Sequence, residues 1–409
     1  MTTYFASAPA RADFLNTHQD YKGLPVVAVG LNLRTTLTAQ PLQERIVKVH
    51  SLDLAKCGES STDSFKVGTN DILEKGFFGN YLRAVVNVVA ERGLADKVQG
   101  LEISVKSSIP IGSGLASSAA LTVAFAALLD HAFKLGFNRR DLAEISYVSE
   151  SQRVGTHCGR LDQYGVCFGG VIRLECTQPY NVEELPFTDL TFAIADSGIR
   201  HSTQDVHPVR QDEINRGLKA LMESSAPDAL KAKLGFRFDQ PRWDMLRENE
   251  ITDYISILDE KVSRRILFTI RMNELNDLAL KVLRCEPTRV KDLSSRLSSV
   301  NLNHIRNTPE KERDWLMLGE IMNQQQILLR DLYEVSLPKI EEMCSAALVA
   351  GAYGAKISGA GMGGSIIALV RNEEIGRKVV DACKSAGASD GWVSVVAEGA
   401  KAGPLPSDT

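Results

Sequence analysis

The stretch Ile109-Pro-Ile-Gly-Ser-Gly-Leu-Ala-Ser-Ser-Ala-Ala-Leu121 places glycine and serine residues directly before a long apolar run. Gly112 and Gly114 allow the backbone to bend tightly and to approach a ligand, while Ser117 and Ser118 are typical of a helix N-terminus. Because such a terminus offers unpaired N–H donors at the positive end of the helix dipole, the stretch predicts a phosphate cradle. An ordinary loop-to-helix junction uses the same residues. The Gly-Lys-Ser/Thr ending of a Walker A loop is missing, so a phosphate site here belongs to another class.

Elements on both sides of this stretch alternate between helix and strand. Apolar spacing predicts a helix over residues 80–92, a strand over 98–107 and a helix over 140–154. Glycines then surround Asp162, which predicts a turn before a strand at residues 170–175. An acid in such a turn is well placed to act on a ligand, although aspartate is common in turns for structural reasons alone.

The N-terminal part carries a cluster of polar residues between two apolar segments. Arg11, Asp13, His18, Asp20 and Tyr21 lie within eleven positions, before a strand-like run that starts at residue 25. They form either a solvated loop or a ligand-binding segment.

The C-terminal part is mostly helical in pattern from residue 208 to 345, after a buried-strand pattern at 190–195 that we take as the start of a second domain. We place the domains at residues 1–185 and 186–409. Gly359, Gly361 and Gly364 match the dinucleotide-binding pattern GxGxxG, but the run after them predicts a strand, whereas that pattern must open a helix. The last ten residues read as a loose tail.

The composition is that of an ordinary globular protein with more than one core, since the chain has 409 residues, 44% of them hydrophobic and 24% charged. The formal net charge of −4 offers no basic field for nucleic acid. No run approaches the ~18 apolar residues of a membrane span, and the N-terminus does not resemble a secretory signal. We therefore expect a cytoplasmic protein without a nucleic acid or membrane partner. The seven cysteines are scattered singly, which predicts reduced core thiols and neither a disulfide framework nor a zinc site.

Taken together, three stretches resemble the signature motifs of the GHMP small-molecule kinases, and within them most closely those of the galactokinases. They are the phosphate-cradle stretch, the glycine-rich stretch from Gly351 to Val370, and Ala8-Pro-Ala-Arg-Ala-Asp-Phe-Leu-Asn-Thr-His-Gln-Asp-Tyr-Lys-Gly23. Shorter echoes are Gly159-Arg-Leu-Asp-Gln163, Ser197-Gly-Ile-Arg-His-Ser202, Pro208-Val-Arg210 and Leu329-Arg-Asp-Leu-Tyr-Glu-Val-Ser336. The resemblance implies an α+β fold of two domains with the active site in the cleft between them. It also implies an ATP-dependent sugar 1-kinase.

The resemblance also implies roles for single residues. It makes Asp162 the catalytic base and Arg11 the partner that keeps this carboxylate ionised and faces the transferred phosphoryl group. It assigns a magnesium ion to Ser118 and Glu150. It assigns ATP to the following residues: Gly112, Ser113, Gly114, Leu115, Ala116, Ser117, Ser118, Gly359 and Gly361. Sugar contacts would come from Thr17, His18, Asp20 and His207.

Two positions depart from the galactokinase pattern. Thr17 replaces a glutamate that lies near the C6 hydroxyl of the sugar in that family, and His207 replaces a tyrosine before Pro-Val-Arg. A carboxylate at position 17 would repel an anionic C6 group, and threonine does not. The acceptor is therefore galactose, or a sugar with an altered C6 end such as galacturonic acid or L-arabinose, or an N-acetylated hexosamine. A non-catalytic regulator that senses galactose and ATP is the other alternative. The oligomeric state stays open, a monomer included.

Overall fold

The computed structural model describes residues 3–156, 158–200, 203–294 and 296–405, and the chain forms two compact units. Unit 1 comprises Met1–Ala12, Val29–Gly170 and Val396–Thr409, and unit 2 comprises Asp13–Ala28 and Val171–Val395. These units are not the two contiguous stretches expected, because Val396–Thr409 clusters with the N-terminal strands and Asp13–Ala28 clusters with unit 2, and no change in composition marks either crossing. As a division into functional domains, the boundary between residues 185 and 186 stays a prediction.

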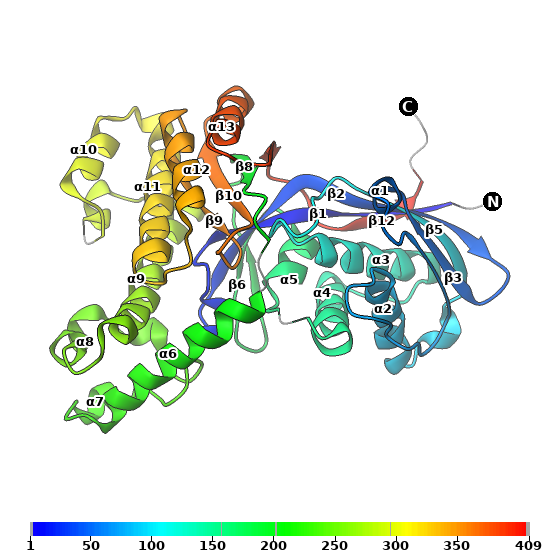
Figure 1. Ribbon diagram of the computed structural model, residues 1–409, viewed down its shortest axis with the longest axis horizontal. Coiled ribbons are helices and arrows are strands. Elements are labelled where there is room, and N and C mark those ends of the chain that lie inside the picture. The colour runs from blue at the N-terminus through cyan, green and yellow to red at the C-terminus, as the bar shows by residue number, and fades with distance from the viewer. Residues whose placement is uncertain (1–2, 157, 201–202, 295, 406–409) are drawn as a thin grey trace. The chain divides into compact units, whose positions relative to one another are not determined.

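Unit 1 is built from a sheet and the helices on one of its faces (Figure 1). The strand order is β12-β1-β2-β5-β3-β4. The strands are β1 (Tyr4–Leu15), β2 (Val26–Leu42), β3 (Ile46–Ser51), β4 (Thr62–Lys66), β5 (Gly100–Ser107) and β12 (Lys401–Pro404). The helices are α1 (Leu52–Lys56), α2 (Gly79–Glu91), α3 (Ser117–Phe133), α4 (Arg139–Val148), a π-helical turn (Ser149–Val154) and α5 (Leu161–Phe168).

Helix α3 occupies the centre of unit 1. It packs against α2, α4 and α5, and most of its residues from Ala119 to Leu129 are buried. A helix that is apolar on every side belongs inside the core, which is why the run after the glycine-serine stretch folds in this way. The predicted helix after that stretch is therefore confirmed, as are the helix at 80–92 and the strand at 98–107.

The predicted loose tail is wrong for the residues that the structure describes. Lys401–Pro404 form β12, which pairs antiparallel with β1 in the register Ser7↔Lys401 to Tyr4↔Pro404. The strand forms because the backbone N–H and C=O groups at the edge of β1 need partners. The last four residues, 406–409, lie outside the described part.

Unit 2 combines a second sheet with a large set of helices. Its sheet has the order β11-β8-β10-β9, and every neighbouring pair is antiparallel. The strands of the unit are β6 (Val171–Leu174), β7 (Val182–Glu184), β8 (Thr191–Asp196), β9 (Gly354–Ser358), β10 (Ser365–Val370) and β11 (Asp390–Val395). The helices are α6 (Thr203–Glu223), α7 (Asp228–Lys231), α8 (Glu248–Ile255), α9 (Glu260–Leu283), α10 (Ser299–Asn307), α11 (Glu310–Asp331), α12 (Pro338–Val349) and α13 (Glu373–Ser385).

Helix α9 is the central helix of unit 2, packed against α6 and α11, and α11 in turn packs against β9. The helical pattern predicted for residues 208–345 is confirmed, and so is the strand, glycine loop and strand order of the third motif. His201 and Ser202, which end one of the echoes quoted above, lie outside the described residues.

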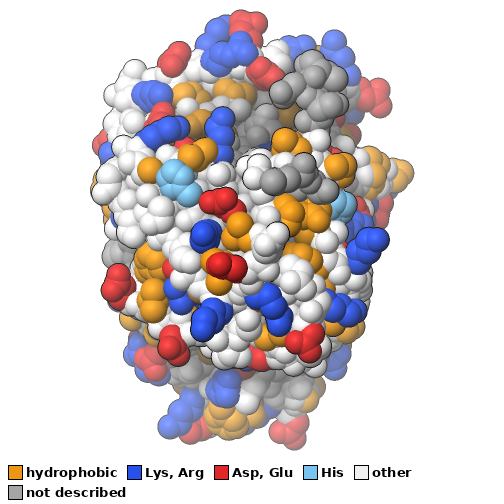
Figure 2. All heavy atoms as spheres, turned by 90° about the vertical axis from the view of Figure 1, so that its right-hand side faces the viewer, with side chains coloured by type: hydrophobic (Ala, Val, Ile, Leu, Met, Phe, Trp, Pro, Cys, Tyr) orange, Lys and Arg blue, Asp and Glu red, His pale blue; other side chains and the backbone are white. Residues whose placement is uncertain are grey.

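Three observations bear on what the composition predicts. On the face shown in Figure 2, basic and acidic side chains are interspersed. None of the helices in the described part of the chain is both long and apolar enough to cross a bilayer. The expected core thiols are only partly confirmed: no disulfide joins any of the seven cysteines in the described part of the chain, Cys167, Cys344 and Cys383 are buried, and Cys57 and Cys285 are exposed.

Candidate active site

The loop between β5 and α3 has the backbone of an anion cradle. Gly112, Gly114 and Ala116 adopt left-handed conformations, with φ of 69°, 79° and 61°. Alternation of left-handed residues turns successive N–H groups toward one side. Ala116 is the N-cap residue of α3, and its side chain cannot form a hydrogen bond with the first backbone N–H groups of the helix. The capping residue therefore leaves these N–H groups available to a ligand. Ser113 is buried and its hydroxyl donates to the Pro110 carbonyl at 2.9 Å, which fixes the turn.

Arg11 joins this loop to Asp162. Its Nε and Nη2 donate to Asp162 Oδ1 at 3.0 and 2.5 Å, and its Nη1 donates to the Gly114 carbonyl at 2.7 Å. The backbone N–H of Arg11 also donates to the Leu115 carbonyl, at 3.2 Å. The guanidinium is buried, and both of its bonds to Asp162 use one carboxylate oxygen, so that Oδ2 is not bonded to Arg11. Unit 1 therefore places a carboxylate and a cation beside the glycine loop that the sequence predicts as a phosphate cradle.

Asp162 does not lie in a turn, contrary to the sequence prediction. It is in the first turn of α5, and that helix buries Leu161, Tyr164 and Val166. The glycines around it indicate a turn, but burial of the apolar side chains between them favours the helix. A solvated loop around Arg11 is likewise excluded, because Arg11 is buried within β1.

Glu150 is a second carboxylate in unit 1, in the π-helical turn that continues α4. Its Oε1 accepts from Thr122 Oγ1 and from Gln163 Nε2, both at 3.0 Å. Burial raises the pKa of Glu150 to about 7, against the effect of hydrogen bonds from Gln163, Ser118 and Thr122, and nearby Asp162 adds to the increase. A buried carboxylate of this kind is stabilised by a cation.

A magnesium ion fits these residues. No ion pair of the described chain involves Glu150, and no three His, Cys, Asp or Glu side chains of that part are placed to hold a metal alone. Magnesium rarely needs such a cage, because it keeps water ligands and takes one or two protein groups together with nucleotide phosphates. Ser118 and Glu150 would supply those protein groups.

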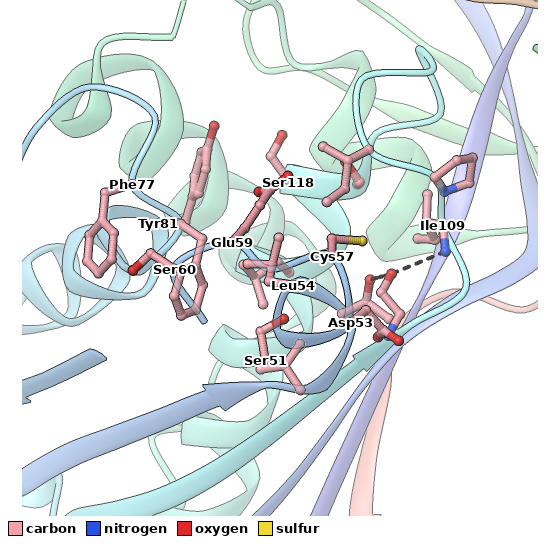
Figure 3. A pocket seen from close by; sticks show the side chains of 18 of the residues that line it. Ser51, Asp53, Leu54, Cys57, Glu59, Ser60, Phe77, Tyr81, Ile109 and Ser118 are labelled. Carbon is pink, nitrogen blue, oxygen red and sulfur yellow. Dashed lines mark hydrogen bonds between the residues drawn. The ribbon is translucent and has the colours of Figure 1, made fainter. Parts of the chain in front are cut away.

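A pocket of about 570 Å³ adjoins the start of α3. Side chains from α1, from the segment before α2 and from α2 itself line it in Figure 3, with Ser118 nearby. Phe77, Tyr81 and Leu54 make its walls largely apolar and aromatic. Such walls suit the flat face of a purine, while the cradle beside them suits phosphates.

Unit 2 holds three of the predicted sugar residues, Thr17, His18 and Asp20, in one tight turn, and the fourth, His207, on α6. Asn16 and His18 are both left-handed, each with φ of 65°, and Asp20 opens a 3-10 turn (Asp20–Lys22). Buried Thr17 accepts a hydrogen bond from Lys356 Nζ at 2.8 Å, and Lys356 is fully buried in β9. The sugar segment and the third motif therefore meet within unit 2.

His18 is a neutral, buried ring. Its Nε2 lies 3.0 Å from the Ala360 carbonyl, which only accepts, so Nε2 must carry the proton and Nδ1 must be an acceptor. Burial, followed by repulsion from His207 and Lys22, lowers the pKa of His18 well below its ordinary value of 6.5. The His207 ring, half-buried on α6, lies 5.3 Å from that of His18.

The state of His18 predicts how stability depends on pH. The unfolded chain takes up a proton at this residue as the pH falls through about 6.5, and the folded chain does not. The free energy of unfolding should then decrease by about 1.4 kcal/mol for each pH unit below that value. Urea unfolding at several pH values between 7.5 and 5.5 tests this, and the decrease should be smaller in His18→Gln. Equal pH slopes for the two proteins would contradict the prediction.

Comparison with known proteins identifies the family. The chain matches the N-terminal domain model of GHMP kinases over residues 80–170 and the C-terminal model over residues 305–389. The chain belongs to the GHMP kinases. A model for the galactose-binding signature of galactokinases matches this GHMP kinase over residues 2–41.

Individual relatives cover almost the whole of this GHMP kinase. It is 27% identical to a galactokinase of Thermococcus kodakarensis over 91% of the chain and 92% of that protein. It is 28% identical to a galactokinase of Clostridium perfringens over 91% and 87%. The crystal structure of Lactococcus lactis galactokinase complexed with galactose has the same fold, with a TM-score of 0.74, 21% identity, and 98% and 95% of the two chains covered. These matches show the expected α+β fold of two domains.

Several residues of the site could not be recognised in the sequence. The pocket beside α3 uses Asp53, Cys57 and Glu59, together with Phe77 and Tyr81. They belong to segments without a motif. The parallel pairing of β3 with β5 and the hydrogen bond from the backbone N–H of Ser107 to Asp53 Oδ2, at 2.5 Å, bring Asp53 and its neighbours toward the glycine loop. The bond between Lys356 and Thr17 likewise joins positions 339 residues apart.

Proposed function

We propose that the chain is an ATP-dependent galactose 1-kinase, which transfers the γ-phosphoryl group of ATP to the anomeric hydroxyl and releases ADP. The main support is the contact chain from Gly114 through Arg11 to Asp162, which links a carboxylate to the glycine loop that would bind the phosphates. The galactokinases among its relatives and the galactose-binding signature support galactose as the acceptor.

The mechanism assigns a step to each group. The C1 hydroxyl of the sugar gives its proton to Asp162 Oδ2 while its oxygen attacks the γ-phosphorus and the bond to the ADP oxygen breaks. The Arg11 guanidinium orients Asp162 and faces the charge on the transferred group. N–H groups of the loop and of α3 hold the phosphates. Bound magnesium would neutralise charge on the β- and γ-phosphates, held by Ser118 and Glu150.

We propose that residues of unit 2 bind the sugar that accepts the phosphoryl group. Neutral His18 would accept a hydrogen bond from a sugar hydroxyl at Nδ1, and Asp20 and Thr17 would contact other hydroxyls. Gly359 and Gly361, in the loop after β9, are proposed to close over the nucleotide. Phosphoryl transfer requires the acceptor to reach the cradle, so the expected cleft between domains stays part of this proposal, as does a cytoplasmic location.

An acceptor with an altered C6 end is the second candidate. It is favoured by Thr17, whose hydroxyl is bonded to buried Lys356 and supplies no carboxylate. Turnover of ATP with magnesium should be measured with D-galactose, D-galacturonic acid, L-arabinose and N-acetylgalactosamine, and phosphorus NMR should identify the phosphorylated position. Preference for galactose supports the main proposal. Preference for galacturonate or arabinose supports the second, and binding without turnover would indicate a sensor.

The substitution Thr17→Glu tests the role of this position. Turnover of galacturonate relative to galactose should fall by at least about tenfold, because two carboxylates close together repel. Thr17→Gln is the matched control, since it has the same size without the charge and should leave the ratio nearly unchanged. Steady-state kinetics with both sugars measure it. An unchanged ratio in Thr17→Glu would place the C6 group elsewhere.

A further inference from the structure

A layer of buried polar side chains lies between the sugar turn and helix α9 in unit 2. Thr269, Asn273 and Asn276 follow one another at intervals of four and three residues, which places them on one face of α9. All three are buried, and the core of a helix rarely holds such a stripe without a reason.

Two residues of the turn bond directly to this face. Asn16 Nδ2 donates to Asn273 Oδ1 at 3.3 Å and to the Pro25 carbonyl at 2.6 Å. Gln19 Nε2 donates to the Thr269 carbonyl at 3.4 Å. From α11, Gln325 Oε1 accepts from the backbone N–H of Asn16 at 3.2 Å.

Several other polar atoms of the amides in this layer have no protein partner among the described residues. They are Asn16 Oδ1, Gln19 Oε1, Gln325 Nε2, and both Oδ1 and Nδ2 of Asn276. All four side chains are 0% exposed. The orientations of three amides follow from the bonds above, so that Asn16 and Gln19 present oxygens and Gln325 presents an N–H donor.

This mixture of atoms identifies the ligand class. Leaving buried amides without hydrogen bonds is unfavourable, and native proteins satisfy nearly all of them with protein groups or with internal water. A cation would suit Asn16 Oδ1 and Gln19 Oε1 but not the N–H donors of Gln325, and an anion would show the opposite mismatch. Water both donates and accepts, and it fits every one of these atoms.

We propose that internal water molecules fill this layer and that Asn276 holds them, which makes Asn276 a positioning residue for the turn Asn16–Asp20. The turn needs such support because Asn16 and His18 are left-handed, a conformation that costs free energy in residues other than glycine. The positioning role rests on the proposed kinase function, whereas the hydration of the layer does not.

The hydration is tested without any activity. Oxygen-17 relaxation dispersion counts long-lived internal waters, and the count should be lower in Asn276→Leu than in the wild type. Asn276→Leu should also lower the urea midpoint of unfolding, because it leaves Asn16 Oδ1 and Gln325 Nε2 without water partners. If the layer is dry, leucine removes an unsatisfied amide, and the midpoint rises or stays while the water count does not change. That result would overturn the proposal.

A second variant, Asn276→Ala, tests the positioning role and can also be used if Asn276→Leu does not fold. Asn276→Ala leaves space and should keep or increase the water count, with a lower urea midpoint. Its KM for galactose should rise about tenfold while its KM for ATP stays the same, because only the sugar turn shifts. If the wild type turns over no sugar, the kinase proposal fails and the water count still decides the hydration. Equal KM values for galactose in an active wild type and Asn276→Ala would refute the positioning role.

Discussion

Asp162→Asn should lower kcat for phosphorylation of galactose by roughly 10²–10⁴, which is the usual contribution of a general base. Asparagine has the shape of the aspartate and still offers an oxygen to the Arg11 guanidinium, which donates twice to Asp162 Oδ1. It has no basic oxygen to receive the proton of the C1 hydroxyl. The loss should therefore appear in kcat, with the KM for ATP little changed.

The measurement is steady-state kinetics at saturating ATP, magnesium and galactose, with the fold checked by circular dichroism. Glu144→Gln is a matched control, because Glu144 is also paired with an arginine, with 2.7 Å between Arg160 Nε and its Oε1. This control should retain nearly full activity. A loss of less than about tenfold in a folded Asp162→Asn would exclude Asp162 as the base.

Glu150→Gln should reduce kcat by about 10²–10³ and raise the magnesium concentration for half-maximal activity, since a metal that neutralises phosphate charge contributes several kcal/mol to the transition state. Glutamine has the same size and can still bond to Thr122 and Gln163, which now contact Glu150 Oε1. The variant should fold well, because a buried carboxyl group whose burial raises its pKa to about 7 is replaced by a neutral amide.

Magnesium titrations of activity and of nucleotide binding measure this effect. Thr122→Val serves as the control, because it removes a neutral hydrogen bond to the same carboxylate and leaves the charge. Its magnesium dependence should stay close to that of the wild type. If Glu150→Gln and the wild type show the same dependence, the metal is held by other groups.

The sequence predicts secondary structure best where the deciding residues lie within the segment itself. Helix α3 follows from a glycine-serine loop and an apolar run, and both features act locally. The glycines around Asp162 predict a turn, whereas packing of Tyr164 and Val166 in a core that the local sequence does not reveal favours the helix there. Strand β12 was missed for a similar reason, since its partner β1 lies at the other end of the chain.

The site itself was predictable in its motifs and unpredictable in its contacts. Arg11 and Asp162 were paired from the family resemblance, and the structure gives them direct bonds. The position of Thr17 against Lys356, the ring of His207 near His18, and the pocket beside α3 all depend on long-range packing. The roles of these residues in catalysis stay predictions until the variants above are measured.

The pairing of β12 with β1 also sets the order in which the protein can be completed during synthesis. Arg11, the glycine loop and Asp162 leave the ribosome early, yet the strand that covers the edge of β1 emerges only after the whole of unit 2. Until then the edge of β1 is open to any other extended chain. The unit that carries the glycine loop and Asp162 therefore cannot be completed before unit 2 has been synthesised.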